Sequence, residues 1–352
     1  MSPTSTLMPT TSICIPTYNG EQYIHECLDS VLTQSISDFE ILVVDDCSSD
    51  STFDIAQEYE RKDPRVRTIR NQHNLGLVGN WNRCIELAQG EWIKFVFQDD
   101  IIDCECLEKM LAVADKDHPF ICCRRDFIFD GVTKETENNY RSLLRTQSID
   151  NLFQGRTEIR GEALVSTILY MGLNTPINFL GEPTSMLLHR AVFSKFGKFN
   201  PLLKQICDLE FWLRVGINTG LRYVPETLAH FRVHAGATTA KNRDRDKLGL
   251  EELDRLVLLH EFAYNPHYVK LRSTDLDNNK TATKWKVAKR ARWISNQIRN
   301  RSAAEIVGSN DPLLDNWNNL LAAYPNLNSS FYARILKLLD QLNNHILWRF
   351  KH

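Results

Sequence analysis

The sequence predicts an α/β protein with a mostly parallel β-sheet covered by helices on both faces, followed by a helical region at the C-terminus. Three observations indicate this fold class. Up to residue 130, short apolar runs alternate with segments of helical periodicity. The apolar runs contain few polar residues, as expected for parallel strands buried on both faces. After Thr239 the strand-like runs stop, and apolar residues recur only at helical spacing.

The first half of the chain is expected to repeat a strand–helix unit four times. The strands are expected at 12–15, 39–44, 66–69 and 92–97, and the helices that follow them at 21–32, 52–59, 77–88 and 107–114. Pro16 should end the first strand, and Gly90 should end the third helix. Right-handed crossovers then place every strand-to-helix loop at one edge of the sheet.

Residues 131–240 follow this pattern less closely. Residues 133–160 are polar and irregular, which predicts a surface excursion. Strands are expected at 184–188 and 221–224, with an amphipathic helical segment from Cys207 between them. Because the pattern changes near residue 240, two domains are expected, an α/β domain at 1–240 and a helical region at 241–352.

Composition is that of an ordinary globular protein. The 352 residues are 43% apolar and 24% charged, and the formal net charge of −2 argues against general nucleic-acid binding. The N-terminus lacks the features of a signal peptide, and no run approaches the ~20 apolar residues of a membrane span. We therefore expect a cytoplasmic protein. The nine cysteines lack zinc-type spacing, so structural thiols are expected.

Four polar loops should meet at the carboxyl edge of the sheet, where open α/β sheets bind ligands. These loops are residues 16–21, 45–46, 71–76 and 99–100. The adjacent carboxylates of Asp99 and Asp100 repel each other unless a positive group lies between them. A divalent cation that carries a diphosphate meets this requirement. A helix N-cap is the alternative, because an amphipathic segment follows.

Six short motifs carry a family resemblance. In order they are Pro16 to Glu21, Val43 to Asp46, Asn74 to Asn82, Gly90 to Asp100, Asp208 to Glu210, and Arg232 to His234. Together they resemble the inverting family 2 glycosyltransferases of GT-A fold, over residues 11–240. The resemblance implies a Rossmann-like sheet and metal-dependent transfer of a sugar from a UDP- or dTDP-sugar to a hydroxyl group. Cell-surface polysaccharide, lipid-linked oligosaccharide or glycoprotein assembly is the expected setting.

The resemblance assigns the nucleotide to the first two loops. Asp45 matches the acid that accepts a hydrogen bond from the imide N–H of uracil or thymine, a role that suits an ionised carboxylate. A turn acid is the alternative for Asp45, and neighbouring Asp46 is expected to be structural. Tyr18 would stack on the base, with Pro16 shaping its loop. Glu21 is either a nucleoside ligand or a partner of a helix N-terminus.

The resemblance also assigns a metal site. Gln98 replaces the first acid of the family's Asp-x-Asp motif, so it is expected to bond to a ribose hydroxyl without adding charge. Asp99 and Asn82 are assigned to the donor sugar nucleotide. Asp100 is assigned as the direct Mn²⁺ or Mg²⁺ ligand, because the last acid binds the metal in the family. His234 matches a histidine that completes the metal shell, and a structural histidine is the alternative.

Asp208 matches the catalytic base of the family. Inverting transfer needs one carboxylate that deprotonates the acceptor hydroxyl as it attacks the anomeric carbon, through an oxocarbenium-like transition state. Cys207 replaces an acid that often precedes this aspartate, and Glu210 is the second candidate for the base. An N-cap role for Asp208 is compatible with catalysis.

The C-terminal region is expected to make the remaining contacts. Residues 280–301 carry eight Lys or Arg and no acid. The apolar stripe of this segment is formed by Val287, Ala291, Ile294 and Ile298. Such a helix either makes a peripheral contact with an anionic membrane or docks by that stripe with its basic face in water. Residues 335–346 should form core or a homodimer contact.

Acceptor binding has no motif of its own. A saccharide, lipid-linked or protein acceptor is expected at the 133–180 excursion and the C-terminal helices. A non-catalytic nucleotide-sugar-binding protein of the same fold is the alternative function, since Gln98 and Cys207 replace family acids. A nucleotidyltransferase would need a basic phosphate loop after the first strand, and residues 16–21 contain no basic residue.

Overall fold

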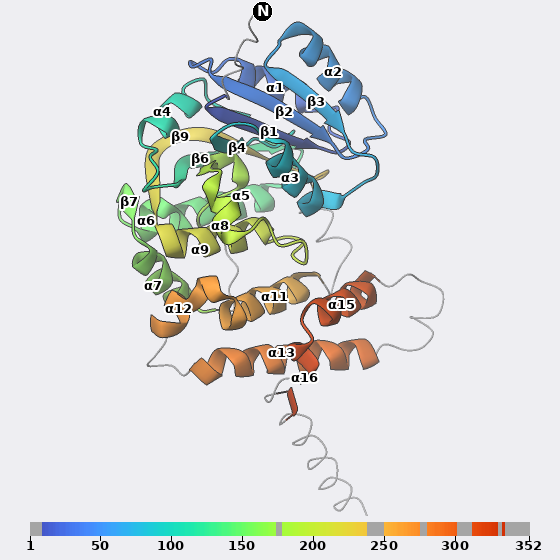
Figure 1. Ribbon diagram of the computed structural model, residues 1–352, viewed down its shortest axis with the longest axis vertical. Helices are drawn as coiled ribbons and strands as arrows, with labels where there is room; N and C mark the ends of the chain where they lie inside the picture. Colours follow the sequence, from blue (N-terminus) through green and yellow to red (C-terminus); the bar gives the residue numbers. More distant parts are fainter. Residues whose placement is uncertain are drawn as a thin grey trace, which may run out of the picture. The chain divides into compact units, whose positions relative to one another are not determined.

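A computed structural model (Figure 1) describes residues 9–173, 178–237, 250–274, 280–300, 312–329 and 333–334. The chain divides into two compact units. The first unit comprises residues 1–170, 177–201 and 206–244, and the second comprises 171–176, 202–205 and 245–352. The domain boundary predicted near residue 240 lies outside the described residues.

The first unit contains a mixed, mostly parallel sheet, which confirms the predicted fold class. Its strands lie in the order β3-β2-β1-β4-β8-β6-β9-β5, and β7 pairs with β9. The pairs formed by β8, β5 and β7 are antiparallel, and the other pairs are parallel. The strands are β1 (Thr11–Thr17), β2 (Phe39–Asp45), β3 (Val66–Arg70), β4 (Trp92–Phe95), β5 (Ile101–Ile102), β6 (Phe120–Asp130), β7 (Glu158–Ile159), β8 (Met186–His189) and β9 (Leu221–His234).

Helices cover both faces of this sheet. Figure 1 shows α1 and α2 on one face of the N-terminal strands and α3 on the other. The helices of the first unit are α1 (Ile24–Leu32), α2 (Thr52–Lys62), α3 (Gly76–Leu87), α4 (Cys106–Ala112), α5 (Lys134–Gln147), α6 (Ile149–Leu152), α7 (Gly161–Met171), the 3-10 helix η1 (Pro183–Ser185), α8 (Ala191–Phe196) and α9 (Cys207–Thr219).

The two faces bury different side chains of the same strands. Ile13 and Ile15 of β1 pack with α1 and α4 in one apolar cluster. On the other face, aromatic rings from α3, β4 and α9 pack against one another around Phe199, whose ring centroid lies 5.2 Å from Trp81 and 4.7 Å from Phe211. This alternation along β1 is the two-residue period of a strand buried on both sides.

The strand order fixes where a ligand can bind. β2 and β3 lie on one side of β1, and β4 lies on the other. The chain therefore changes direction at β1, which opens a crevice at the carboxyl ends of β1 and β4. Tyr18 follows β1, and Gln98 to Asp100 follow β4, so the predicted site residues of both loops face this crevice region.

β1 and β9 are longer than predicted, whereas β4 ends at Phe95, two residues early. β1 continues through Pro16 to Thr17, because the fixed φ of proline is compatible with extended backbone. The strand expected at 221–224 does not end there, because β9 continues past Pro225 to His234. The register of β9 against β6 shifts next to Cys123 and Arg124, so an irregularity accommodates the proline without ending the strand.

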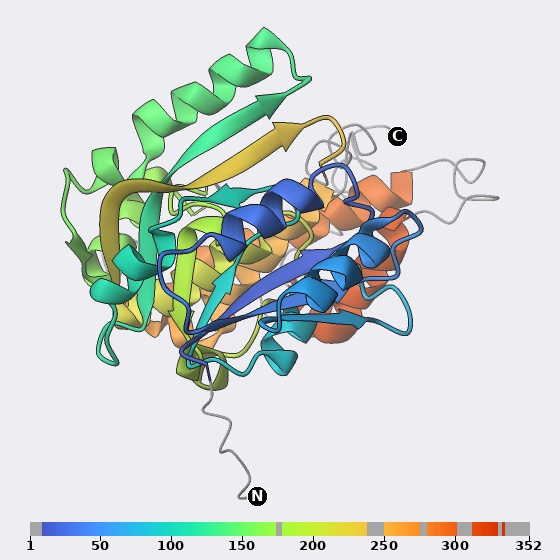
Figure 2. The same ribbon diagram turned by 90° about the horizontal axis from the view of Figure 1, so that it is seen from above.

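The expectation of an irregular excursion at 133–160 is wrong. Figure 2 shows α5 lying alongside β6, which β9 flanks. None of the residues of α5 is fully buried, and its apolar side chains, Tyr140, Leu143 and Leu144, form only one short stripe. The Tyr140 ring packs on Phe127 of β6, with 5.0 Å between ring centroids. The helix is further supported by its N-cap Thr133 and by ion pairs of Glu137 with Lys134 and Arg141.

The described part of the second unit is helical. Its elements are α11 (Leu250–Tyr264), the 3-10 helix η2 (Pro266–Tyr268), α12 (Val269–Thr274), α13 (Lys280–Asn300), α15 (Pro312–Ala323) and α16 (Asn326–Ser329). α13 packs on α11 and buries Val287, Ala291 and Ile294. Residues 335–346, expected to form core or a dimer contact, lie outside the described residues. No helix among the described residues is long and apolar enough to cross a membrane.

Candidate active site

A side-chain amide joins the carboxyl ends of β1 and β4. Gln98 accepts a hydrogen bond from Tyr18 N at 2.9 Å and donates one to Tyr18 O at 3.1 Å. Gly20 lies directly against this amide, because a Cβ on Gly20 would overlap the Gln98 side chain. The Tyr18 side chain remains 52% exposed at the rim. Gln98 therefore holds the backbone of the Tyr18 loop. The sequence predicts a bond from Gln98 to a ribose hydroxyl and does not predict this contact.

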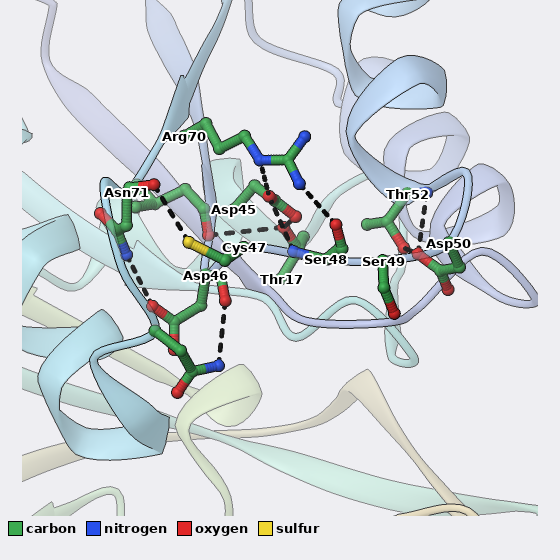
Figure 3. Close-up of polar contacts among 12 residues, drawn as sticks. Thr17, Asp45, Asp46, Cys47, Ser48, Ser49, Asp50, Thr52, Arg70 and Asn71 are labelled. Carbon is green, nitrogen blue, oxygen red and sulfur yellow. Dashed lines mark hydrogen bonds and ion pairs between the residues drawn. The ribbon is translucent and has the colours of Figure 1, made fainter.

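The loop after β2 is built on two buried acids (Figure 3). Asp45 Oδ2 accepts a hydrogen bond from Ser48 N at 3.1 Å and forms an ion pair with Arg70 Nε at 3.3 Å. Asp45 Oδ1 has a longer contact, 3.4 Å, from the Thr17 hydroxyl. None of the Asp45 side chain is exposed. Contact with a base would require the Arg70 ion pair or the loop to move.

Asp46 holds the start of α3, in agreement with its predicted structural role. Its carboxylate accepts hydrogen bonds from Leu75 N at 2.8 Å, Gly76 N at 2.9 Å and Asn71 Nδ2 at 2.8 Å. These donors include backbone N–H groups at a helix N-terminus, which favours negative charge. The next residue, Cys47, has a φ of 65° and donates a hydrogen bond from Sγ to Asn71 O.

Three other predicted donor-site residues have structural contacts. Pro16 is buried within β1. Glu21 accepts a hydrogen bond from Ser51 N at 2.9 Å, at the start of α2, which supports the helix N-terminus alternative. Asn82 donates to Phe199 O at 3.0 Å and accepts from Phe199 N at 3.1 Å. Both ends of the Asn82 amide thus hold the Phe199 backbone, and a contact of Asn82 with the donor stays a prediction.

The carboxylate of Asp99 meets the imidazole of His234. Asp99 Oδ2 lies 3.0 Å from His234 Nε2, and both side chains are half-buried. At this distance the two side chains form a hydrogen bond. Neighbouring ligands of an octahedral cation with bonds of about 2.1 Å are also separated by about 3.0 Å, so a cation could replace the shared proton without a change in this spacing. Among the described residues, no group of three or more His, Cys, Asp or Glu side chains is arranged to hold a metal. Diphosphate and water oxygens would have to complete the shell.

Asp100, which is predicted to be the direct metal ligand, faces inward. Its carboxylate accepts hydrogen bonds from Arg232 N at 2.9 Å and from the Thr184 hydroxyl, and the residue is fully buried. Burial, with the nearby charge of Asp99, raises the pKa of Asp100 well above its usual range. Asp100 therefore joins β9 to the loop after β4, and Asp99 is the less buried acid of the pair.

Tyr23, just before α1, supports His234. Its ring contacts the imidazole edge-to-face, with 4.7 Å between ring centroids. Its hydroxyl donates to Asp130 at 2.8 Å, and the Arg232 guanidinium lies over its ring. Burial and the hydrogen bond to Asp130 raise the pKa of Tyr23 to about 12, so the hydroxyl stays a donor.

Asp208 lies in the first turn of α9 and keeps part of its surface exposed. Its Oδ1 accepts a hydrogen bond from Leu209 N at 2.7 Å, and its Oδ2 accepts one from Asn178 Nδ2 at 2.7 Å. Burial raises the pKa of Asp208 to about 7, the hydrogen bond from Leu209 N opposes this shift, and the charge of Glu182 adds to it. A carboxylate with such a pKa is suited to accept a proton near neutral pH.

The second candidate for the base has a structural environment. Glu210 is fully buried, and its Oε2 forms an ion pair with Arg214 at 2.9 Å, one turn further along α9. Cys207, which replaces a family acid, is also buried. All nine cysteines are free thiols, and seven of them are buried. Of the two acids proposed for proton transfer, Asp208 alone keeps exposed surface.

The fold is that of α/β proteins that bind nucleotides at the carboxyl edge of a sheet. Residues 12–174 match the family described as "Glycosyl transferase family 2". An uncharacterized protein of Mycobacterium tuberculosis is 32% identical over 230 residues, which are 65% of this chain and 69% of that protein. This chain belongs to glycosyltransferase family 2.

A protein of known name is similar over a shorter stretch. Poly(ribitol-phosphate) beta-N-acetylglucosaminyltransferase TarS of Staphylococcus aureus is 38% identical over 110 residues, or 30% of this chain and 19% of TarS. The solved structure of S. aureus TarS residues 1–349 with UDP-GlcNAc matches with a TM-score of 0.55 and 19% identity, covering 90% of this chain and 81% of that one. This similarity supports the GT-A fold.

Proposed function

We propose that this protein is a metal-dependent inverting glycosyltransferase that moves a hexosyl or related sugar from a UDP- or dTDP-sugar to a hydroxyl acceptor. The observation that carries the proposal is the geometry of Asp208, a partly exposed carboxylate in the first turn of α9 that Leu209 N and Asn178 hold by hydrogen bonds. Family membership supports the same reaction class.

In the proposed reaction the acceptor oxygen forms a bond to the anomeric carbon of the donor sugar. The bond from that carbon to the diphosphate oxygen breaks on the opposite face, and its electron pair leaves with the nucleoside diphosphate. Asp208 accepts the proton of the acceptor hydroxyl as the new bond forms. The hydrogen bonds from Leu209 N and Asn178 hold the carboxylate in one orientation for this step.

We assign the cation to Asp99 and His234 in place of Asp100. Their oxygen and nitrogen atoms are 3.0 Å apart, whereas both carboxylate oxygens of Asp100 already accept internal hydrogen bonds. An imidazole ligand favours Mn²⁺ over Mg²⁺. When bound, such a cation supplies positive charge that stabilises the departing nucleoside diphosphate.

The nucleotide is assigned to the crevice between β1 and β4. The exposed ring of Tyr18 is available to stack on a base, and the Gln98 amide keeps its loop in place. Asp45 is retained as the acceptor for a base imide N–H, on the condition that the Arg70 ion pair opens when the nucleotide binds. Glu21 and Pro16 shape this loop without contacting the donor.

The acceptor is proposed to be a saccharide, lipid-linked or protein hydroxyl in cell-surface polysaccharide, lipid-linked oligosaccharide or glycoprotein assembly. The similarity to TarS, whose name gives poly(ribitol-phosphate) as its acceptor, favours a surface polymer. In this proposal residues 1–240 bind the donor and catalyse transfer, and the helices at 241–352 contact the acceptor, a membrane surface or a second copy. The protein is proposed to act in the cytoplasm.

Calorimetric titration with UDP and dTDP, each with and without Mn²⁺, tests the proposal. We expect one of the two nucleotides to bind, and to bind more tightly with Mn²⁺. A screen of UDP- and dTDP-sugars for nucleotide release should then identify the donor. Absence of binding to either nucleotide under both conditions would falsify the proposal.

A non-catalytic nucleotide-sugar-binding protein is the second candidate. The observation that favours it is Gln98, whose amide holds the Tyr18 backbone where the family has an acid. This candidate predicts UDP or dTDP binding without turnover of any donor. The raised pKa of Asp208 favours the enzyme, because a binding protein gains nothing from a partly exposed base.

A further inference from the structure

A single turn connects the proposed base with the loop that carries the metal residues. Residues 178–185 begin with Asn178, whose Nδ2 donates to Asp208 Oδ2 at 2.7 Å. They continue to Thr184, whose hydroxyl donates to Asp100 Oδ2. The same short segment therefore contacts α9 at one end and the loop after β4 at the other.

The Asn178 amide has a fixed orientation. Its Oδ1 accepts a hydrogen bond from Gly181 N at 3.0 Å, and its Nδ2 donates to Gly181 O at 2.9 Å. Because Gly181 N must find an acceptor, the carbonyl end of the amide has to face it, and the NH₂ end has to face Asp208. The second hydrogen of Nδ2 is thereby directed at the Asp208 carboxylate.

The turn that orients Asn178 is itself anchored to α9. Trp212 Nε1 donates to Gly181 O at 3.1 Å, one turn after Asp208. Gly181 has a φ of 122°, and a Cβ at this position would lie 2.6 Å from Ser185 Oγ. Only glycine fits this conformation and this close approach. Asn178 and Asp208 are therefore held in one rigid arrangement.

The chemistry of the donor matters as much as its position. A cation in contact with Asp208 would strongly favour the ionised form and weaken the base, whereas a neutral amide orients the carboxylate without cancelling its charge. The charged groups that face Asp208 are Glu182 and Arg125, and they form an ion pair with each other. Asn178 Nδ2 is the neutral side-chain donor in contact with the carboxylate.

We propose that Asn178 is a positioning residue for proton transfer by Asp208, which it orients through Oδ2 while leaving the carboxylate basic. The inference rests on the proposed function, in which Asp208 is the base. It adds to that function a second residue, Asn178 of the turn at 178–185, which orients the base.

The first test measures the titration of Asp208 without using activity. Carbon-13 NMR of aspartate side-chain carboxyl groups should show a resonance that titrates near pH 7 and is missing in Asp208→Asn. In Asn178→Ala the carboxylate loses a donor, and in Asn178→Asp it gains a second carboxylate at contact distance. Both changes disfavour the ionised form of Asp208. The midpoint of the Asp208 titration should therefore rise, by at least about 1 pH unit in Asn178→Asp.

The second test follows donor turnover against pH in the same variants. The acid limb of kcat should move upward with the NMR midpoint, and kcat should fall ~10–100-fold while the donor KM changes less than about twofold. Asn151→Ala is the matched control, because the Asn151 amide also holds backbone carbonyls, those of Leu144 and Arg145, but does so from α6. This control should match the parent in both tests.

The outcomes separate the inference from the proposed function. An Asp208 midpoint that is the same in parent, Asn178→Ala and Asn178→Asp overturns the inference, whatever the activity. A loss of thermal stability with an unchanged midpoint would assign Asn178 a purely structural role, which also overturns it. A parent protein that binds neither UDP nor dTDP overturns the proposed function, while the NMR titration still reports on the Asn178–Asp208 contact.

Discussion

The acids at the carboxyl edge of the sheet have the same chemistry and different surroundings. Asp45 and Asp46 are buried and accept hydrogen bonds from loop backbone. Asp99 faces an imidazole, and Asp208 combines partial exposure with a raised pKa. Environment therefore distinguishes two buried loop acids from an acid that faces an imidazole and from an acid that keeps exposed surface, which residue type alone does not.

Asp208 should make stability depend on pH. Its pKa in the folded protein, about 7, lies above the ~3.9 of an unfolded aspartate. The folded state then binds more protons between these values, so this group lowers stability as pH rises through that window. Asp208→Asn removes the effect and should raise Tm relative to the parent by at least about 2 °C at pH 8, and by less at pH 5. An equal Tm difference at both pH values would contradict the raised pKa.

Asp99 and Asp100 should fail differently when each is replaced by alanine. Asp99→Ala should remove most of the Mn²⁺-dependent part of nucleotide affinity with little loss of stability, because the side chain is half-buried and faces His234. Asp100→Ala leaves the Thr184 hydroxyl and Arg232 N without their acceptor, which should cost about 1–3 kcal/mol of unfolding free energy. Calorimetry and denaturant unfolding of both variants check this, and a reversed pattern would restore Asp100 as the ligand.

The regular strand–helix units were predictable from sequence because their apolar periods are strong. β2, α3 and β3 lie close to their expected ranges. α5 is not predicted because its apolar side chains form only one short stripe in a polar sequence, and β9 is predicted too short because Pro225 resembles a strand end. These are cases in which tertiary context overrides the local signal.

The site was predictable to the level of loops and less so to the level of side chains. Motif order brought Tyr18, Asp99 and His234 to the edge of the sheet, but which of two adjacent acids turns inward depends on Thr184, far along the chain. Asn178 gave no signal, because an isolated asparagine is ordinarily a turn residue. The glycine and proline of Gly181-Glu182-Pro183 are common turn residues, but they do not indicate a contact with Asp208.

The junction between α3 and β4 requires glycine at position 90. A Cβ on Gly90 would overlap the backbone of Thr11 and Ser12 in β1. Gly90→Ala should therefore separate the starts of β1 and β4 and lower the unfolding free energy by about 1–3 kcal/mol. Denaturant unfolding measures this, with Glu91→Ala as the exposed neighbouring control. Equal stability of the two variants would show that the junction can relax.

The basic helix α13 packs on α11 by its apolar stripe, as expected for a docked helix. Val287, Ala291 and Ile294 of the stripe are buried, while Lys286 and Lys289 remain exposed. Any attraction to an anionic membrane should then be electrostatic, at about 1 kcal/mol for each basic residue near the surface. We expect salt-sensitive sedimentation with anionic vesicles that weakens in Lys286→Glu/Lys289→Glu. Equal sedimentation with neutral vesicles would contradict this account.

For the molecule as a whole, the central claim is that Asp208 is the base of a sugar transfer. The most direct measurement is the transfer rate and nucleotide affinity of Asp208→Asn beside the parent, with the donor found by the screen and with Mn²⁺ present. We predict a fall in transfer of ~10²–10⁴-fold with nucleotide affinity unchanged, because the variant keeps the size of the residue and loses the proton acceptor. Transfer at the parental rate would contradict the account.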